Sequence, residues 1–208
     1  MSPKDKPAPR PRMKAAEREK VILAEAIRFF AEHGFEGQTR ELAKRVGIAH
    51  SALYRHFPSK EALIEQVYET VFLSRWNPEW ETWLTDRSRP LEDRLIQFYL
   101  AYVERIFHYD WVRIFVFSGL RSYNITGRYL TIIREKLVLP VSCELQEIGS
   151  SEGRVSELEE EAVWGLHGQI FYIAIRKYVY GTPVPANLEP TIVDHVRRFV
   201  LSSRRRFL

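Results

Sequence analysis

The chain has 208 residues, with 31 Lys and Arg against 27 Asp and Glu, which gives a formal net charge of +4. It is 45% apolar, 28% charged and 13% aromatic, a composition that excludes both a disordered chain and a membrane bundle. The single cysteine, Cys143, excludes a disulfide scaffold and fits a reducing compartment. No apolar run approaches the ~18 residues of a membrane span, and the N-terminus lacks the apolar core of a secretory signal. We therefore expect a soluble cytoplasmic protein with no membrane partner.

The positive charge is concentrated in the first third of the chain. Residues 1–60 hold 13 Lys and Arg against 7 Asp and Glu, a net charge of +6, whereas residues 61–208 hold 18 against 20, a net charge of −2. A basic segment beside a slightly acidic one suggests a polyanionic partner such as nucleic acid. A solvated basic tail is the alternative, because four of these Lys and Arg residues lie among the prolines of residues 1–13.

The predicted fold is all-α, with about nine helices. Residues 1–13 are predicted to form a disordered basic arm, because four closely spaced prolines prevent a helix. The first four helices are expected over residues 14–33, 40–46 and 50–57, and from residue 60 to Asn77-Pro78. Gly34 is expected to close the first helix in the left-handed region, and Thr39 and Ser59 are expected to be N-caps.

Five more helices are predicted after a short turn that bears Trp80 and Trp83. They are expected to begin at Pro90, to cover 111–118 and 126–148, to continue from a Ser156 and Glu159 capping box to residue 180, and to cover 190–206. Pro140 lies inside the predicted helix 126–148 and should kink or split it. We find no convincing strand, internal repeat or glycine-rich phosphate loop.

The stretch from Thr39 to Lys60 carries the most informative spacing. Two short helices meet at Gly47, which can adopt a positive φ, and Ala43 is small where the second helix must approach closely. An apolar seam is supplied by Val46, Ile48, Leu53 and Phe57. The spacing is typical of a helix-turn-helix motif, whose second helix enters the DNA major groove, although an ordinary αα-hairpin can share it.

A longer pattern surrounds this motif: Phe30, Gly34-Phe35, Thr39, Leu42-Ala43, Val46-Gly47-Ile48, Leu53-Tyr54-Arg55-His56-Phe57 and Lys60-Glu61-Ala62-Leu63. The segment Phe29–Leu63 thereby resembles the DNA-binding domain of the TetR family of bacterial transcriptional regulators. Its most specific part is the Leu-Tyr-x-His-Phe-x-x-Lys-x-x-Leu string. The resemblance implies a helix-turn-helix DNA-binding domain over residues 14–60 and a C-terminal ligand-binding and dimerisation domain over residues 61–208.

The same resemblance implies roles for individual residues. The predicted DNA-binding residues are Thr39, Arg40, His50, Ser51, Ala52, Tyr54, Arg55, His56 and Lys60. His50, Ser51 and Ala52 would face base edges, and His50 or Arg40 could donate to guanine. Tyr54, His56 and Lys60 would bind phosphates, although His56 could instead cap the end of its own helix. Three departures from the family are a shorter link before Leu42, Ala49 at an N-cap position, and Ser51 in place of glycine or proline.

The C-terminal part holds 22 of the 27 aromatic residues, and aromatic-rich bundles often enclose a flat or apolar ligand. The predicted ligand-binding residues are Phe98, Tyr102, Trp111, Phe115, Tyr123, Tyr129 and His167. For His167, a hydrogen-bonded core histidine is the alternative. Trp76, Trp80 and Trp83 could form a hinge that responds to the ligand, or a hydrophobic plug.

By resemblance to the family, the last two long helices would form a dimer interface. The predicted contacts are Trp164, Gly168, Phe171, Ile175, Val196 and Phe199, and Gly165 and Gly168 would allow close approach. Packing of these residues within one subunit is the alternative. No metalloprotease motif, nucleophile elbow or paired metal-ligand spacing is present, so we expect neither an enzyme nor a cofactor, and no catalytic or metal-binding residues.

The expected function is a homodimeric repressor that a small apolar or aromatic effector releases from double-stranded operator DNA. One alternative is a DNA-binding adaptor controlled by a protein partner. Another is a ligand-binding helical protein or enzyme whose helix-turn-helix is vestigial.

Overall fold

The computed structural model describes residues 14–120, 123–149 and 157–205, and the regular elements in these ranges are all helical. The all-α prediction is therefore confirmed for this part of the chain. The predicted basic arm over residues 1–13 and the capping residue Ser156 lie outside the described ranges. Half of the net charge of residues 1–60 also lies outside them, because residues 14–60 hold 9 Lys and Arg against 6 Asp and Glu.

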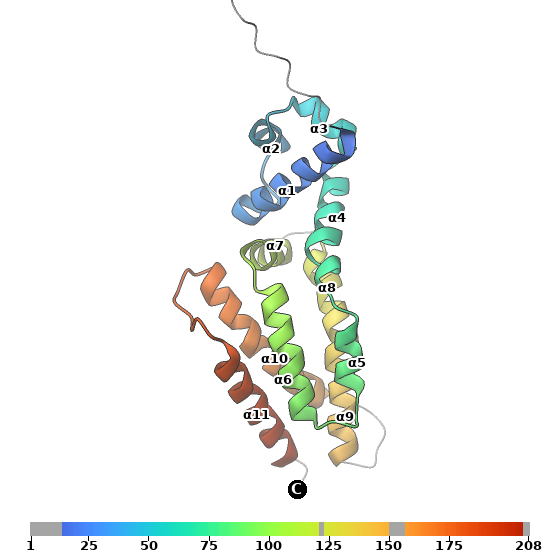
Figure 1. The fold of residues 1–208 in the computed structure, drawn as a ribbon, viewed down its shortest axis with the longest axis vertical. Helices are drawn as coiled ribbons and strands as arrows, with labels where there is room; N and C mark the ends of the chain where they lie inside the picture. The colour runs from blue at the N-terminus through green and yellow to red at the C-terminus, as the bar shows by residue number, and fades with distance from the viewer. Residues whose placement is uncertain (1–13, 121–122, 150–156, 206–208) are drawn as a thin grey trace, which may run out of the picture.

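Eleven α-helices follow one another in the described ranges: α1 (Ala15–His33), α2 (Thr39–Val46), α3 (His50–His56), α4 (Lys60–Val71), α5 (Glu79–Thr85), α6 (Leu91–Ile106), α7 (Tyr109–Gly119), α8 (Ile125–Ile133), α9 (Leu139–Gly149), α10 (Glu157–Tyr178) and α11 (Glu189–Arg205). A 3₁₀ turn, η1 (Leu73–Arg75), follows α4, and a π turn, η2 (Arg134–Val138), joins α8 to α9. Helices α1–α3 lie at one end of an elongated molecule, and the remaining helices form a bundle below them (Figure 1).

Two differences from the prediction explain why the structure has more than about nine helices in the described ranges. The helix predicted from residue 60 ends at Val71, and the predicted turn that bears Trp80 and Trp83 is the separate helix α5. The helix predicted over residues 126–148 divides at η2, immediately before Pro140. Proline has no backbone N–H and its ring clashes with the preceding turn, so a wider π turn accommodates it and the predicted split is confirmed.

Helix ends follow the predicted signals in most places, with two corrections. Ser59 caps α4 by accepting a hydrogen bond from the Ala62 backbone N–H at 3.1 Å, and Gly47 is left-handed at φ 73° and ψ 35°. Gly34 also has positive φ, but its ψ of −172° places it outside the left-handed helical region. The prediction that Thr39 is an N-cap is wrong, because Gln38 holds that position and Thr39 is the first residue of α2.

The N-terminal helices share one small core. The apolar face of α1 is buried at Ile22, Ala26, Phe29 and Phe30, and it packs against α2, α3 and α4. Leu53 and Phe57 of the predicted seam are buried, whereas Val46 and Ile48 are half-buried against the same core. The short helices α2 and α3 therefore depend on packing against α1, because isolated helices of this length are unstable in water.

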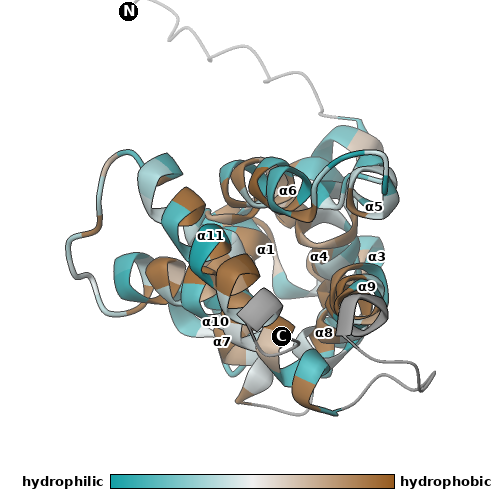
Figure 2. Cartoon of the chain, turned by 90° about the horizontal axis from the view of Figure 1, so that it is seen from below, coloured by the Kyte–Doolittle hydropathy of each residue, from teal (hydrophilic) through white to brown (hydrophobic). Residues whose placement is uncertain are grey.

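The C-terminal bundle is arranged around α6, which packs against α5 and α11, while α10 contacts α7, α9 and α11. Seen along the bundle, apolar segments lie toward neighbouring helices and hydrophilic ones lie outside (Figure 2). Arg94 of α6 is 1% exposed, and it donates hydrogen bonds to the Leu84 and Arg89 carbonyls and to Glu144. This buried arginine therefore ties α5, α6 and α9 together.

Two other arginines hold α1 and α4 to the rest of the bundle. The Arg113 guanidinium on α7 donates to the Ala31 carbonyl of α1 and, at 3.4 Å, to the Tyr178 carbonyl of α10. Arg128 on α8 forms a bidentate pair with Glu65 of α4 at 2.6 and 2.8 Å, and it lies 3.8 Å from the centre of the Tyr68 ring. Neither residue was singled out from the sequence, because both contacts join segments far apart in the chain.

Candidate functional site

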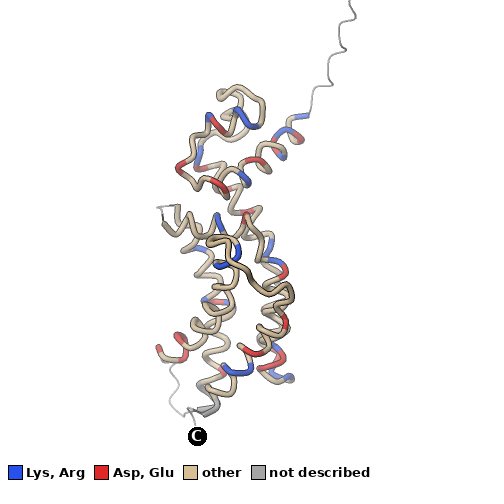
Figure 3. The backbone as a smooth tube through the Cα atoms, turned by 90° about the vertical axis from the view of Figure 1, so that its left-hand side faces the viewer, with Lys and Arg blue, Asp and Glu red and all other residues tan. Residues whose placement is uncertain are grey.

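Helices α2 and α3 present one exposed surface and bury the opposite one. Leu42, Ala43 and Leu53 face α1, whereas Arg40, Ser51 and Arg55 are exposed. The turn between the two helices is made by Gly47, where a larger residue would be strained. The two helices carry four Lys and Arg residues against one acidic residue, Glu41. Figure 3 marks the basic and acidic positions along the backbone. The arrangement has the helix-turn-helix geometry that the spacing predicted.

Three of the predicted DNA-binding residues form a hydrogen-bonded group, which we call the Thr39 cluster: Thr39, His50 and Tyr54. Thr39 Oγ1 lies 2.9 Å from His50 Nε2 and 2.9 Å from the Tyr54 hydroxyl. The His50 and Tyr54 rings meet edge to face, 5.0 Å apart, because residues four apart share a helix face. The sequence placed all three at the DNA surface but did not predict these bonds, which depend on how α2 crosses α3.

The remaining predicted DNA-binding residues have different surroundings. Ala52 is half-buried. The His56 Nδ1 lies 3.2 Å from Glu19 Oε1 of α1, so this nitrogen does not cap its own helix, which was the alternative to the predicted phosphate contact. Lys60 opens α4, and its ammonium lies 6.0 Å from the centre of the Tyr123 ring. Glu19 and Tyr123 were not predicted to lie near this surface.

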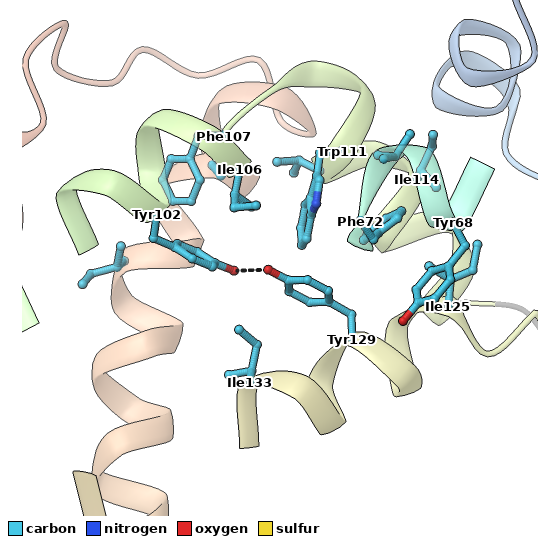
Figure 4. Close-up of a cluster of buried hydrophobic side chains, with 14 of the residues drawn as sticks. Tyr68, Phe72, Tyr102, Ile106, Phe107, Trp111, Ile114, Ile125, Tyr129 and Ile133 are labelled. Atoms are coloured by element: carbon cyan, nitrogen blue, oxygen red, sulfur yellow. Dashed lines mark hydrogen bonds between the residues drawn. The ribbon is translucent and has the colours of Figure 1, made fainter. Parts of the chain in front are cut away.

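A second candidate site lies in the interior of the bundle. Six of the seven predicted ligand-binding residues belong to one connected group of rings, which we call the aromatic core: Phe98, Tyr102, Trp111, Phe115, Tyr129 and His167. Figure 4 shows the Tyr102 and Tyr129 side chains approaching each other from opposite sides, with the Trp111 ring beside them. Tyr123, the seventh, lies apart from this group: its ring packs 4.9 Å from Phe35 of the N-terminal core.

The aromatic core contains polar atoms with few partners. The Tyr102 and Tyr129 hydroxyls are joined by a long hydrogen bond of 3.4 Å. Among the described residues, no hydrogen bond engages the Tyr99 hydroxyl, Trp111 Nε1 or His167 Nδ1, although all three atoms are buried. Tyr99 was missed from the sequence, although its spacing of three from Tyr102 places both on one side of α6.

Burial decides the charge states of these groups. Desolvation raises the pKa of Tyr99, Tyr102 and Tyr129 and lowers the pKa of His167 to about 4. All four side chains are therefore neutral near pH 7. The aromatic core can contact a flat apolar surface and can offer hydrogen bonds, but it carries no charge of its own for an ionic ligand.

An open cleft of about 570 Å³ lies beside the aromatic core. Its lining includes Arg75, Asn77, Arg105, His108 and Trp80. Trp80 is only 1% exposed, and its ring also packs 5.6 Å from Phe98 and 5.7 Å from Tyr102. The Trp80 side chain therefore separates the cleft from the aromatic core. Of the three tryptophans predicted to form a hinge or a hydrophobic plug, Trp80 is the one that lies between this cleft and the buried rings.

The predicted dimer contacts on α10 and α11 do not all face outward. Val196 is 0% exposed within the chain, so the prediction that it contacts a partner is wrong. The Phe171 ring lies among Phe107, Trp111, Phe115 and His167 of its own chain. Trp164, Ile175 and Phe199 are half-buried, whereas Gly165 and Gly168 are exposed with open space above them. The sequence missed three large exposed residues on these helices: Leu158, Tyr172 and Leu201.

The described part of the chain offers little support for other classes of site. Within it, no group of three or more His, Cys, Asp or Glu side chains is placed to hold a metal ion. No helix in the described ranges combines the length and apolar character needed to cross a bilayer.

Comparison with known proteins agrees with this geometry. The family model described as bacterial regulatory proteins, tetR family, matches residues 22–67. The HTH-type transcriptional repressor KstR2 of Mycolicibacterium smegmatis is 26% identical over 174 residues, which cover 82% of this chain and 84% of that protein. The nucleoid occlusion factor SlmA of Aliivibrio fischeri is 44% identical over 129 residues, which cover 59% of this chain and 62% of SlmA, less than two thirds of its length.

Solved structures extend the likeness to the whole fold. A TetR-like transcriptional regulator from Rhodococcus sp. RHA1 superimposes with a TM-score of 0.67 at 17% identity, covering 91% of this chain and 99% of that one. A tetR-family regulator from Streptomyces coelicolor gives a TM-score of 0.62 at 18% identity, with 93% and 85% covered. The helix-turn-helix and the matching family model show that residues 22–67 are similar to the DNA-binding domain of tetR family regulators, and the solved structures show that the described chain shares their fold.

Proposed function

We propose that this protein is a homodimeric repressor that binds operator DNA through α2 and α3. In this proposal, residues 14–60 are the DNA-binding domain, residues 61–208 bind an effector and a second copy of the chain, and the protein works in the cytoplasm. The observation that carries the proposal is the exposed surface of α2 and α3, which presents Arg40, Ser51 and Arg55 together with the Thr39 cluster.

Different side chains on this surface suit the two tasks of DNA recognition. Tyr54, Arg55 and Lys60 offer donors to phosphate oxygens, which would set affinity and register. His50, Ser51 and Ala52 lie at the start of α3, where they would meet base edges in the major groove. His56, which faces Glu19 in the free protein, would reach phosphate only after that contact is given up.

The exposed surface of α10 and α11 supports a symmetric dimer. Gly165 and Gly168 permit close approach of a second helix, and Tyr172, 52% exposed, offers an apolar ring beside them. A two-fold axis through this surface would place two copies of α3 in successive major grooves, about 34 Å apart. Trp164, Ile175 and Phe199 complete the proposed contact surface.

The aromatic core supports an uncharged effector with at least one hydrogen-bonding atom. Trp111 Nε1 is a donor only, so a ligand carbonyl, ether or hydroxyl oxygen would satisfy it, and the Tyr99 hydroxyl could also donate. Leaving such groups buried without partners costs about 1–3 kcal/mol each, and a ligand could recover this free energy. Displacement of the Trp80 side chain would open the route from the cleft.

Binding in the aromatic core could reach the DNA-binding helices through α8. Tyr129 belongs to the aromatic core, and the adjacent residue Arg128 is paired with Glu65 of α4. An effector that repositions Tyr129 would therefore act on α4, which is connected to α3. It changes DNA affinity only to the extent that it prefers one arrangement of the helices over the other.

Electrophoretic mobility shift with the DNA upstream of the protein's own gene tests DNA binding. We expect a salt-sensitive shift that Lys60→Ala weakens, while Lys177→Ala, which removes an exposed lysine of α10, leaves it unchanged. Absence of a shift with this DNA and with a pool of random duplexes would overturn the proposal.

Thermal unfolding with neutral aromatic ketones such as benzophenone tests effector binding. We expect a raised melting temperature in the wild type and a smaller rise in Trp111→Phe, which keeps a ring but removes the N–H donor. If no ketone, alcohol or hydrocarbon probe raises the melting temperature, the small effector is refuted. Control by a protein partner would then be favoured.

A further inference from the structure

We infer that His50 accepts a hydrogen bond from an exocyclic amino group in the major groove, either adenine N6 or cytosine N4. The Thr39 cluster determines which ring nitrogen of His50 carries its proton, and so determines which base edge His50 can recognise. This inference rests on the proposed function, in which α3 enters the major groove and Tyr54 binds a phosphate.

The number of protons in the Thr39 cluster limits the directions of its two hydrogen bonds. Thr39 Oγ1 is within 2.9 Å of both His50 Nε2 and the Tyr54 hydroxyl, and neither distance by itself says which atom donates. Each hydroxyl has one proton to donate and can also accept, and a neutral imidazole has one N–H and one acceptor nitrogen. The two hydrogen bonds can therefore run in one direction along the cluster or in the other.

A bound phosphate selects the direction. The oxygens of a DNA phosphodiester only accept, and the Tyr54 side chain, 37% exposed, would have to donate its single proton to them. The Tyr54 oxygen then accepts from the Thr39 hydroxyl, and the Thr39 oxygen must accept from His50 Nε2–H. With its proton on Nε2, neutral His50 presents Nδ1 as an acceptor.

The base edges in the major groove differ in whether they donate or accept a hydrogen bond. In the major groove adenine N6 and cytosine N4 are donors, whereas guanine O6 and N7 and thymine O4 are acceptors. No hydrogen bond to His50 Nδ1 is present within the described ranges. This nitrogen is not one of the buried polar atoms without a partner, so it is accessible to solvent. Contact with DNA thus leaves this nitrogen for a base, and it favours an amino group over the guanine contact expected from the sequence.

The test begins with selection of duplexes by the full chain from a random pool. The base read by His50 is the position whose preference is lost in His50→Ala. We expect adenine or cytosine there. Replacing it with purine or 2-pyrimidinone, which lack the amino group, should weaken wild-type binding about fivefold, as expected for one hydrogen bond, and should leave His50→Ala unaffected.

Two variants test whether Thr39 directs the preference. Thr39→Val keeps the shape of the side chain but removes the hydroxyl, so the ratio of adenine or cytosine over guanine at this position should fall by at least fivefold. Thr39→Ser keeps the hydroxyl and should restore the ratio. A role of Thr39 in stability alone would change overall affinity and leave the ratio unchanged, and that result would overturn the inference.

The remaining outcomes separate this inference from the proposed function. Guanine at the His50 position, with binding weakened by 7-deazaguanine, would show that His50 donates and would overturn the inference while DNA binding stands. Normal selection by His50→Ala at every position would also overturn it, because His50 would then read no base. Failure of the wild type to select any sequence would remove the proposed function and the inference together.

Discussion

The buried imidazole of His167 should make the stability of this protein depend on pH in a specific window. His167 is 7% exposed, among the rings of Tyr99, Tyr102, Trp164 and Phe171, and no described hydrogen bond reaches its Nδ1. Desolvation lowers its pKa from 6.5 to about 4. Because the unfolded chain binds this proton more readily than the folded chain, acid should favour unfolding.

The size of the effect follows from the two pKa values. The contribution is fully present above about pH 6.5 and is lost as the pH falls toward 4, at up to 1.36 kcal/mol per pH unit. Relative to neutral pH, the free energy of unfolding should fall by about 2 kcal/mol at pH 5 and by about 3 kcal/mol at pH 4.

Urea unfolding, followed by circular dichroism from about pH 4 to about pH 7.5, measures this loss. The matched variant is His167→Phe, which keeps an aromatic ring beside Phe171 and removes the titrating group. Other carboxylates and histidines titrate in both proteins, so the difference between the two curves isolates His167. The wild type should lose about 2 kcal/mol more than the variant by pH 5. Parallel curves would refute the reasoning, because His167 would then bind its proton equally well in both states.

Three further predictions concern the arginine contacts and the DNA surface. Arg113→Met should lower the free energy of unfolding by about 2 kcal/mol in urea titrations, because the Ala31 carbonyl loses a charged donor; an unchanged midpoint would contradict this. Arg128→Met should lower the free energy of unfolding by less than about 1 kcal/mol, since the pair with Glu65 is exposed. If a ligand probe stabilises the wild type and releases it from DNA, the same probe should release this variant less. Undiminished release would show that α4 is controlled through other contacts. Tyr54→Phe should weaken DNA binding without changing its salt dependence, whereas Lys60→Ala should reduce the slope of log K against log salt by about one. Equal slopes in both variants would count against a Lys60 phosphate contact.

Features set by neighbouring residues were predictable from the sequence. Gly47, Ser59 and Pro140 act on the backbone around them, and the turn, the cap and the split helix were all confirmed. The buried stripes of α1 and α6 follow from helical periodicity, because each places one apolar face toward the core. The helix-turn-helix was therefore recognisable before its three-dimensional structure was considered.

Features that depend on the crossing of distant helices were not predictable in this way. Thr39 looked like a cap because its type suits one, but α3 places His50 and Tyr54 beside its hydroxyl. An aromatic residue such as Tyr123 can fill any apolar space, and periodicity does not say which side of the bundle it joins. Val196 shares its helix with exposed residues, so only the packing of α11 against α6 and α10 shows that it faces inward.

The π turn before Pro140 has a mechanical consequence for the bundle. It divides a long helical segment into α8, held to α4 by Arg128, and α9, held to α6 by the Arg94 pair with Glu144. In a π turn the backbone hydrogen bonds span five residues, and the surplus residue can be redistributed along the chain without leaving a peptide group unpaired. The π turn therefore marks the place in this segment where the regular helical bonding changes, between a part held to α4 and a part held to α6. We expect any shift of α8 together with α4 to be taken up at this turn.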